Sequence, residues 1–211
     1  LCLDAYRGFI MVCLAFGGFG LAATADLHLK VAPDSAFWRA VYAQWEHGAW
    51  VGCTFWDLIM PAFTFMVGLA MAYSYVRRQR EGHTTAQMFR HACVRALLLI
   101  ALAVFLTTGT GKETQWVFTN VLAQIGLGYP LLFLCWNRGY RVQALAAAAA
   151  LGLTWLAFVL HGGSTAPGAG VTAAWSAQHE AHLAAAWHKN ANVFHAFDVW
   201  FLNLFPRASP F

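Results

Sequence analysis

Long apolar runs, separated by short polar segments, make up most of the chain. A helix needs about 20 apolar residues to cross about 30 Å of hydrocarbon, since each residue adds 1.5 Å. Several runs come close to this length, so the pattern predicts a bundle of about five membrane-spanning helices. They cover residues 6–23, 55–76, 92–108, 117–136 and 142–160.

The pattern changes after His161, where glycines and a proline indicate a loop. Near the end of the chain, bulky apolar residues recur at i, i+3, i+4, i+7 and i+8, and Pro206 ends the pattern. This run is too short to span a bilayer, so we expect an amphipathic helix that lies in the outer interface. The residues are Phe197, Trp200, Phe201, Leu204 and Phe205.

Composition supports an all-α, polytopic membrane protein. Hydrophobic residues make up 60% of the chain and charged residues only 10%, whereas about a quarter of the residues in an average soluble domain are charged. The net charge of +4 is not gathered in a patch of the kind that binds nucleic acid. Nucleic acid is therefore excluded as a partner, and the lipid bilayer is the partner that composition predicts.

The basic residues predict an orientation, because lysine and arginine accumulate in the cytoplasmic loops of membrane proteins. Eight arginines fall on one side of the five-helix arrangement, which we assign to the cytoplasm. Residues 24–54, 109–116 and the chain from His161 onward then face outward. The eight are Arg7, Arg77, Arg78, Arg80, Arg90, Arg95, Arg138 and Arg141.

The cysteines and the chain ends add two expectations. The five cysteines stand singly in or beside apolar runs, which indicates small core residues and neither a disulfide framework nor a zinc site. The sequence begins at Leu1 without methionine and stops at Phe211. We expect it to be a piece of a longer chain.

The most unusual segment for chemistry is residues 44–61, at the outer mouth of the second apolar run. His47 can exchange a proton near neutral pH or act as a nucleophile. Asp57 lies just inside the apolar run, where an ionised carboxylate needs a partner or water. A contact between the two would fix the imidazole tautomer and stabilise its cation, so both are candidate catalytic residues.

Structural roles are the alternatives for this pair. Thr54 and Asp57 have the spacing of a capping box, with Thr54 as the N-cap and Asp57 favoured by the helix dipole. This role for Asp57 does not exclude a catalytic one. For His47 the alternative is a solvated loop residue.

The outer segment carries a second candidate, a group of four histidines. His179 and His182 are one residue short of the H-E-x-x-H spacing of metalloproteases. A loose zinc site is one interpretation, but we favour a solvated loop that seeks the interface, and we predict no metal cofactor. The other two members are His188 and His195.

Four further residues are candidates for cofactor binding. Arg7 and Arg95 lie at the cytoplasmic ends of the first and third runs, where arginine can hold a phosphate-bearing cofactor or serve only as a membrane anchor. Asn120 and Gln124 are one helical turn apart. They can line a polar cavity or form hydrogen bonds between helices.

Several separate motifs resemble one family, the membrane acetyltransferases typified by lysosomal heparan-alpha-glucosaminide N-acetyltransferase and their bacterial homologues. The resemblance covers nearly the whole chain, and its longest block contains both His47 and Asp57. The matching segments are residues 3–8 (LDAYRG), 47–61 (HGAWVGCTFWDLIMP), 63–68 (FTFMVG), 120–126 (NVLAQIG), 187–190 (WHKN) and 197–207 (FDVWFLNLFPR).

The resemblance implies transfer of an acetyl group from cytosolic acetyl-CoA to an acceptor on the far side of the membrane. The family's active-site histidine falls on His47, which the predicted orientation puts outside. Members of the family are longer, so the resemblance implies that this chain holds the first half of the bundle and is inactive alone. It also implies a multi-pass protein of a bacterial inner membrane, a sugar-like acceptor and a possible homodimer.

Two other classes of function remain open. In a small-molecule transporter or carrier, His47, Asp57 and Asn120 would line a permeation route. In a noncatalytic subunit or metal-sensing module, the late histidines would carry the function. Label transfer to an external acceptor distinguishes the enzyme from both.

Overall fold

The computed structural model contains only helices and loops in the residues that it describes, which are 2–15, 17–109, 111, 113–207 and 210–211. The expected all-α class is therefore confirmed. The chain divides into two units, Leu1–Tyr73 and Ser74–Phe211, with the boundary inside helix α4 (Ile59–Arg80). Each unit is described separately.

In the first unit, the helix expected over residues 6–23 is interrupted. Helix α1 (Cys2–Ala15) is followed by the short 3-10 helix η1 (Gly17–Gly20) and by α2 (Leu21–Val31). The expectation of one continuous helix was wrong because the glycines of η1 adopt positive φ angles, which glycine does without steric cost and a right-handed helix does not allow.

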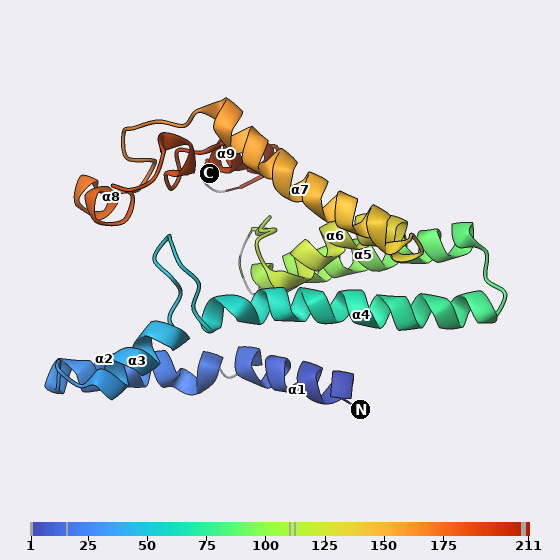
Figure 1. The fold of residues 1–211 in the computed structure, drawn as a ribbon, viewed down its shortest axis with the longest axis horizontal. Helices are drawn as coiled ribbons and strands as arrows, with labels where there is room; N and C mark the ends of the chain where they lie inside the picture. The colour runs from blue at the N-terminus through green and yellow to red at the C-terminus, as the bar shows by residue number, and fades with distance from the viewer. Residues whose placement is uncertain (1, 16, 110, 112, 208–209) are drawn as a thin grey trace. The chain divides into compact units, whose positions relative to one another are not determined.

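Helix α3 (Ala36–Trp45) folds back against α2, and Figure 1 shows the two side by side. Ser35 begins α3 by accepting a hydrogen bond from the backbone N–H of Trp38. The Trp38 ring stacks on the His28 ring of α2, with centroids 4.1 Å apart. The packing of α3 on α2 therefore sets the position where the loop with His47 begins, directly after Trp45.

A small apolar core joins α1 to the start of α4. Ile10 and Cys13 of α1 are buried against Ile59, with Trp56 and Phe63 packed around them. Trp56 belongs to the 3-10 helix η2 (Trp56–Leu58), which leads directly into α4. This packing fixes the first residues of α4 and the 3-10 turn before it, which contains Asp57.

In the second unit, α5 and α6 pack most extensively against each other, and Figure 1 shows them side by side. A glycine allows this approach, because a Cβ built at Gly126 would lie 2.8 Å from the carbonyl oxygen of Ala96. The helices of this unit are α5 (Thr85–Thr108), α6 (Val121–Trp136), α7 (Tyr140–His161), α8 (Ala173–His179), the 3-10 helix η3 (Ala185–Trp187) and α9 (Val193–Leu202).

Three helices in the described part of the chain are long and apolar enough to cross a membrane. They are α5, α7 and the segment Trp56–Arg80, and α1 and α2 add a fourth if the bent pair counts as one span. Helix α6 has 16 residues and covers about 24 Å, which is short of the hydrocarbon thickness. Large side chains project from α5 and α7 unburied, as lipid-facing side chains do; among them are Leu97, Leu98, Phe105, Leu145, Leu151 and Leu160.

The outer segment is more ordered than the sequence suggests. The Glu180 side chain is only 2% exposed and accepts hydrogen bonds from the Ser176 hydroxyl and the Lys189 backbone N–H. These bonds tie α8 to the chain that leads into α9. His188 is also buried whereas His182 is exposed, so the expected solvated loop is solvated only in part.

Helix α9 differs in its bounds from the amphipathic helix expected over residues 197–205. It begins earlier because the Asn192 side chain accepts bonds from the N–H groups of Phe194 and His195. It ends at Leu202, so Phe205 lies outside it and stacks on Trp116, with centroids 4.9 Å apart.

Candidate functional site

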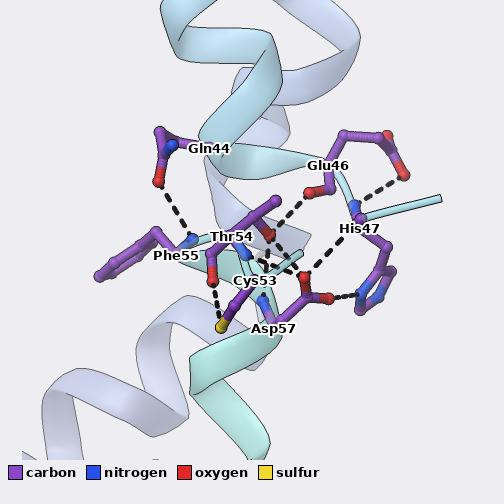
Figure 2. Close-up of polar contacts among 8 residues, drawn as sticks. Gln44, Glu46, His47, Cys53, Thr54, Phe55 and Asp57 are labelled. Carbon is purple, nitrogen blue, oxygen red and sulfur yellow. Dashed lines mark hydrogen bonds and ion pairs between the residues drawn. The ribbon is translucent and has the colours of Figure 1, made fainter. Parts of the chain in front are cut away.

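The loop between α3 and α4 is organised around the carboxylate of Asp57. The two oxygens of Asp57 accept from three residues of the loop, and Figure 2 shows the carboxylate at the centre of these contacts. Oδ1 lies 2.7 Å from Nδ1 of His47. Oδ2 lies 3.2 Å from the backbone N of Gly48 and 3.0 Å from that of Thr54.

The expected contact between His47 and Asp57 is therefore present, and it fixes the state of the ring. An ionised carboxylate can only accept hydrogen bonds, so Nδ1 of His47 carries the proton. Nε2 is then the basic nitrogen of the neutral ring. The His47 side chain is 66% exposed and that of Asp57 27%, so Nε2 can be reached from outside the loop.

The capping role considered for Asp57 is present as well. The Thr54 N–H donates to Asp57 Oδ2, and the Asp57 N–H donates to Thr54 Oγ1 at 3.3 Å. This reciprocal pair has the geometry of a capping box at the start of η2 and α4. The two interpretations of Asp57 are compatible because each carboxylate oxygen serves a different one.

Two residues that the sequence interpretation did not select, Glu46 and Gln44, support the site. Glu46 accepts the His47 N–H at its side chain, 3.2 Å away, and its carbonyl oxygen is 2.9 Å from the Thr54 hydroxyl. Gln44 accepts the N–H of Phe55 at 3.2 Å. Only Thr54 had a spacing signal, because backbone and loop-closing contacts of this kind have no sequence pattern.

Gly48 has a steric role. A Cβ built on it would lie 3.3 Å from Asp57 Oδ2, which is tighter than most contacts of real Cβ atoms. The missing side chain therefore allows the backbone N–H of Gly48 to approach the carboxylate.

Aromatic rings surround the base of the loop. The Trp56 centroid is 6.4 Å from that of His47 and 6.0 Å from that of Trp45. Gly18 of η1, at φ 64°, lies against the Trp45 ring, because a Cβ built on it would come within 2.8 Å of that ring. These rings can stack on a sugar or serve as an interface belt.

The four candidates for cofactor binding come from α1, from α5 and from the start of α6. Arg7 lies exposed on α1 in the first unit. The Arg95 guanidinium of α5 sits 5.0 Å from the centroid of the Tyr129 ring. Asn120 caps α6 by accepting the Ala123 N–H at 2.9 Å, and Gln124 donates to the Thr119 carbonyl at 3.0 Å.

Asn120 also borders a cavity of about 290 Å³ between the end of α5 and the start of α6. Its amide donates to the Thr107 hydroxyl and to the Val117 carbonyl, both at 3.3 Å. Asn120 therefore forms a hydrogen bond to α5, and it borders a cavity whose wall is largely apolar because of residues such as Leu106 and Val121.

Two histidines of the outer segment, His179 and His188, each contact different neighbours. His179 stacks on Trp175, with centroids 4.5 Å apart, and contacts its carbonyl oxygen. Nε2 of His188 is 3.3 Å from the Leu183 carbonyl oxygen. Among the described residues, no group of three or more His, Cys, Asp and Glu could hold a metal ion.

Comparisons of the chain with models of protein families, with curated proteins and with solved structures find no match.

Proposed function

We propose that this protein is a membrane acyltransferase. It moves an acetyl group from cytosolic acetyl-CoA to an amine or hydroxyl of a sugar-like acceptor on the outer face. His47 is the proposed catalytic base and Asp57 the residue that orients it. The observation that carries the proposal is the 2.7 Å contact between His47 Nδ1 and Asp57 Oδ1.

This contact supports base catalysis because it leaves Nε2 unprotonated and directs it away from the carboxylate. The Asp57 carboxylate also stabilises the imidazolium that forms when Nε2 accepts a proton. Two backbone N–H groups hold the carboxylate in position, so the ring does not depend on a mobile partner.

In the proposed step, the acceptor amine or hydroxyl gives its proton to Nε2 of His47 and attacks the carbonyl carbon of the thioester. The C–S bond breaks, and the imidazolium returns the proton to the departing CoA thiolate. In a two-step alternative, Nε2 itself attacks the thioester carbonyl carbon, the C–S bond breaks and CoA leaves as a thiolate. The acceptor then attacks the acetyl-imidazole, the C–N bond to Nε2 breaks, and the acceptor's proton neutralises the thiolate. An acetyl adduct on the peptide that contains His47 would distinguish the two routes.

The same proposal includes the full membrane arrangement. The bent α1–α2 pair and the short α6 join the three long apolar helices as crossings, which gives about five spans in an inner membrane. The aromatic rings beside His47 then lie at the outer interface. A homodimer is part of the proposal only through the resemblance of the sequence motifs.

Acetyl-CoA is the proposed donor, and the candidates for contacting it are named within each unit separately. Arg7 and Arg95 supply guanidinium groups for its phosphates, and Asn120 with Gln124 supplies amide groups closer to the outer side. Support for this part comes from the positions of the two arginines toward the predicted cytoplasmic ends of their helices.

The test uses the full-length protein in proteoliposomes that contain acetyl-CoA labelled in its acetyl group. We expect labelled acetyl on an external amino-sugar acceptor with the native protein. The His47→Ala variant should lose transfer by at least about a hundredfold, which is the usual contribution of a general base. Retained turnover would remove His47 from the mechanism.

The matched control is His182→Ala, which removes an exposed histidine from the outer segment and should leave transfer unchanged. Solute flux without acylation would instead support a carrier in which His47 and Asp57 line the route. Neither acylation nor flux would leave a noncatalytic role.

A further inference from the structure

The turn between α4 and α5 encloses a basic cavity of about 350 Å³, which we call the α4–α5 cavity. We propose that it binds a phosphate group. Four cationic or basic side chains line it. They are Arg78, His83, Arg90 and His91.

The turn itself is built to bring these side chains together. Gly82 adopts φ 84°, and its N–H donates to the Gln79 carbonyl while the His83 N–H donates to the Arg78 carbonyl, both at 3.1 Å. These bonds close the end of α4 in the manner of a Schellman motif. His83 is therefore held beside the last turn of α4, which carries Arg78.

Helix α5 starts immediately after this turn. The Thr84 hydroxyl accepts the Gln87 N–H at 3.3 Å, and the Gln87 side chain accepts the Thr84 N–H at 2.9 Å. Because this capping box already satisfies N–H groups of the first turn, the proposal rests on the side chains of the cavity.

Arg78 is oriented by its neighbour. Its Nη2 lies 3.1 Å from Nε2 of His91, and guanidinium can only donate, so His91 is the acceptor and carries its proton on Nδ1. The bond uses one of the five N–H donors of the guanidinium and restricts its plane. A pre-oriented guanidinium loses less conformational freedom when it binds a ligand.

No acidic side chain among the described lining residues neutralises the positive charge of the cavity. The nearby Glu81 is bound by Nε of Arg77 at 2.8 Å. That bond is the main reason why the pKa of Glu81 lies below its ordinary value, and the charges of His83 and Arg78 lower it further.

A phosphate is the anion that fits these groups best. Its tetrahedral oxygens can accept paired bonds from the planar forks of Arg78 and Arg90 and single bonds from the histidines. The volume lies at the small end of the range for ligand pockets, which suits a phosphate with a small polar substituent.

Position favours a lipid headgroup as the source of the phosphate. The cavity lies where two candidate spans, Trp56–Arg80 and Thr85–Thr108, meet at their arginine-rich ends. Met88 and Val94 supply an apolar wall beside the cations. Basic pockets between membrane helices on the cytoplasmic side bind anionic headgroups, and a soluble phosphate compound is the other source with the same chemistry.

The test measures binding of phosphatidylglycerol to the purified full chain by native mass spectrometry, with phosphatidylcholine as the neutral lipid. The double variant Arg78→Gln, Arg90→Gln should weaken phosphatidylglycerol binding by at least about tenfold, because bonds to charged groups are lost. The double variant Arg78→Lys, Arg90→Lys should show a smaller loss because it keeps the positive charge. Some loss should remain because lysine cannot form the paired bonds.

The matched control is the double variant Arg138→Gln, Arg141→Gln. It removes the same charge from the same predicted face but not from the cavity, and its binding should stay within about twofold of the native protein. Equal losses in the two double glutamine variants, or no loss in either, would overturn the proposal. Native helix content by circular dichroism must be retained for each variant that is compared.

A second arm adds inorganic phosphate to distinguish the sources. Competition by phosphate, lost in the Arg78→Gln, Arg90→Gln variant, supports recognition of the phosphate group in either molecule. Phosphatidylglycerol binding without competition supports the lipid headgroup. Phosphate binding alone, without a preference for phosphatidylglycerol, overturns the lipid as the source and supports a soluble phosphate ligand.

Discussion

At the scale of single residues, Asp57 has two tasks that one substitution can separate. In Asp57→Asn, the amide oxygen can still accept from His47 Nδ1, but the NH₂ group then faces the N–H groups of Gly48 and Thr54, which donate to Oδ2 in the native protein. The opposite rotamer satisfies the two backbone groups and presents the NH₂ group to His47. Either arrangement disturbs the tautomer or the loop.

We therefore predict that Asp57→Asn lowers acetyl transfer by at least about a hundredfold, with membrane insertion intact. Nitrogen chemical shifts of the His47 ring should change from one tautomer to a mixture. Asp26→Asn is the control, because it removes an exposed carboxylate that pairs with Lys30 at 2.7 Å. A His47 ring that keeps its tautomer in Asp57→Asn would contradict the orienting role.

At the scale of elements, the contact between α5 and α6 depends on one glycine. A Cβ at Gly126 would lie 2.7 Å from Ile100 Cγ1 and 2.8 Å from the Ala96 carbonyl oxygen. We predict that Gly126→Ala lowers the free energy of unfolding by about 1–3 kcal/mol, as overpacking does, measured by denaturation in detergent micelles.

Gly128→Ala is the matched control on the same helix. A Cβ there meets no atom within 4 Å, so the change should be neutral or stabilising by up to about 1 kcal/mol through helix propensity. Equal destabilisation by both substitutions would mean that the close approach at Gly126 is not the cause.

The outer segment is the second element with a testable dependence. Burial raises the pKa of Glu180, but the bonds from Ser176 and Lys189 and the nearby positive charges lower it more, so the pKa of the carboxyl lies below its ordinary value of 4.5. A depressed carboxyl pKa stabilises the fold at higher pH, and this stability is lost as pH falls through the pKa of the folded state.

We predict that the protection factors of the amides in residues 172–192, which compare each exchange rate with the intrinsic rate at the same pH, stay high at neutral pH and fall as pH drops through the pKa of Glu180 in the folded state. Glu180→Gln should exchange faster already at neutral pH and lose this pH dependence, because the amide does not titrate. If the variant keeps the same dependence on pH, another group controls the segment.

Features that extend over many residues could be predicted from the sequence, whereas features that depend on one residue or on the loop conformation could not. The length of the apolar runs predicted the helical class and the approximate positions of α4, α5 and α7, because a helix that crosses a membrane needs about 20 consecutive apolar residues. It missed the break at η1, which depends on the positive φ angles of single glycines, and it misjudged α9, which begins at the Asn192 cap. The pairing of His47 with Asp57 could be predicted because an ionised carboxylate at the edge of an apolar run needs a partner or water. The supporting bonds of Gln44 and Glu46 depend on the loop conformation, which has no sequence signal.

At the scale of the whole molecule, the distribution of arginines predicts which ends of the helices face the cytoplasm, and this can be tested with cysteine labelling. Cys53 is exposed in the same loop as His47, so a membrane-impermeant maleimide should label it in intact spheroplasts. Cys53→Ala should remove this label. In the Cys53→Ala background, a cysteine introduced by His83→Cys at the turn after α4 should react only after permeabilisation.

The reason is electrostatic, since arginines that flank a span resist translocation and keep their end of the helix inside. Labelling of the His83→Cys site in intact spheroplasts would reverse the orientation of α4 and bring the loop of His47 to the cytoplasmic side. Acetyl-CoA and His47 would then share a compartment. The acyl transfer proposed here would no longer cross the membrane, although the chemistry of the His47–Asp57 pair would be unchanged.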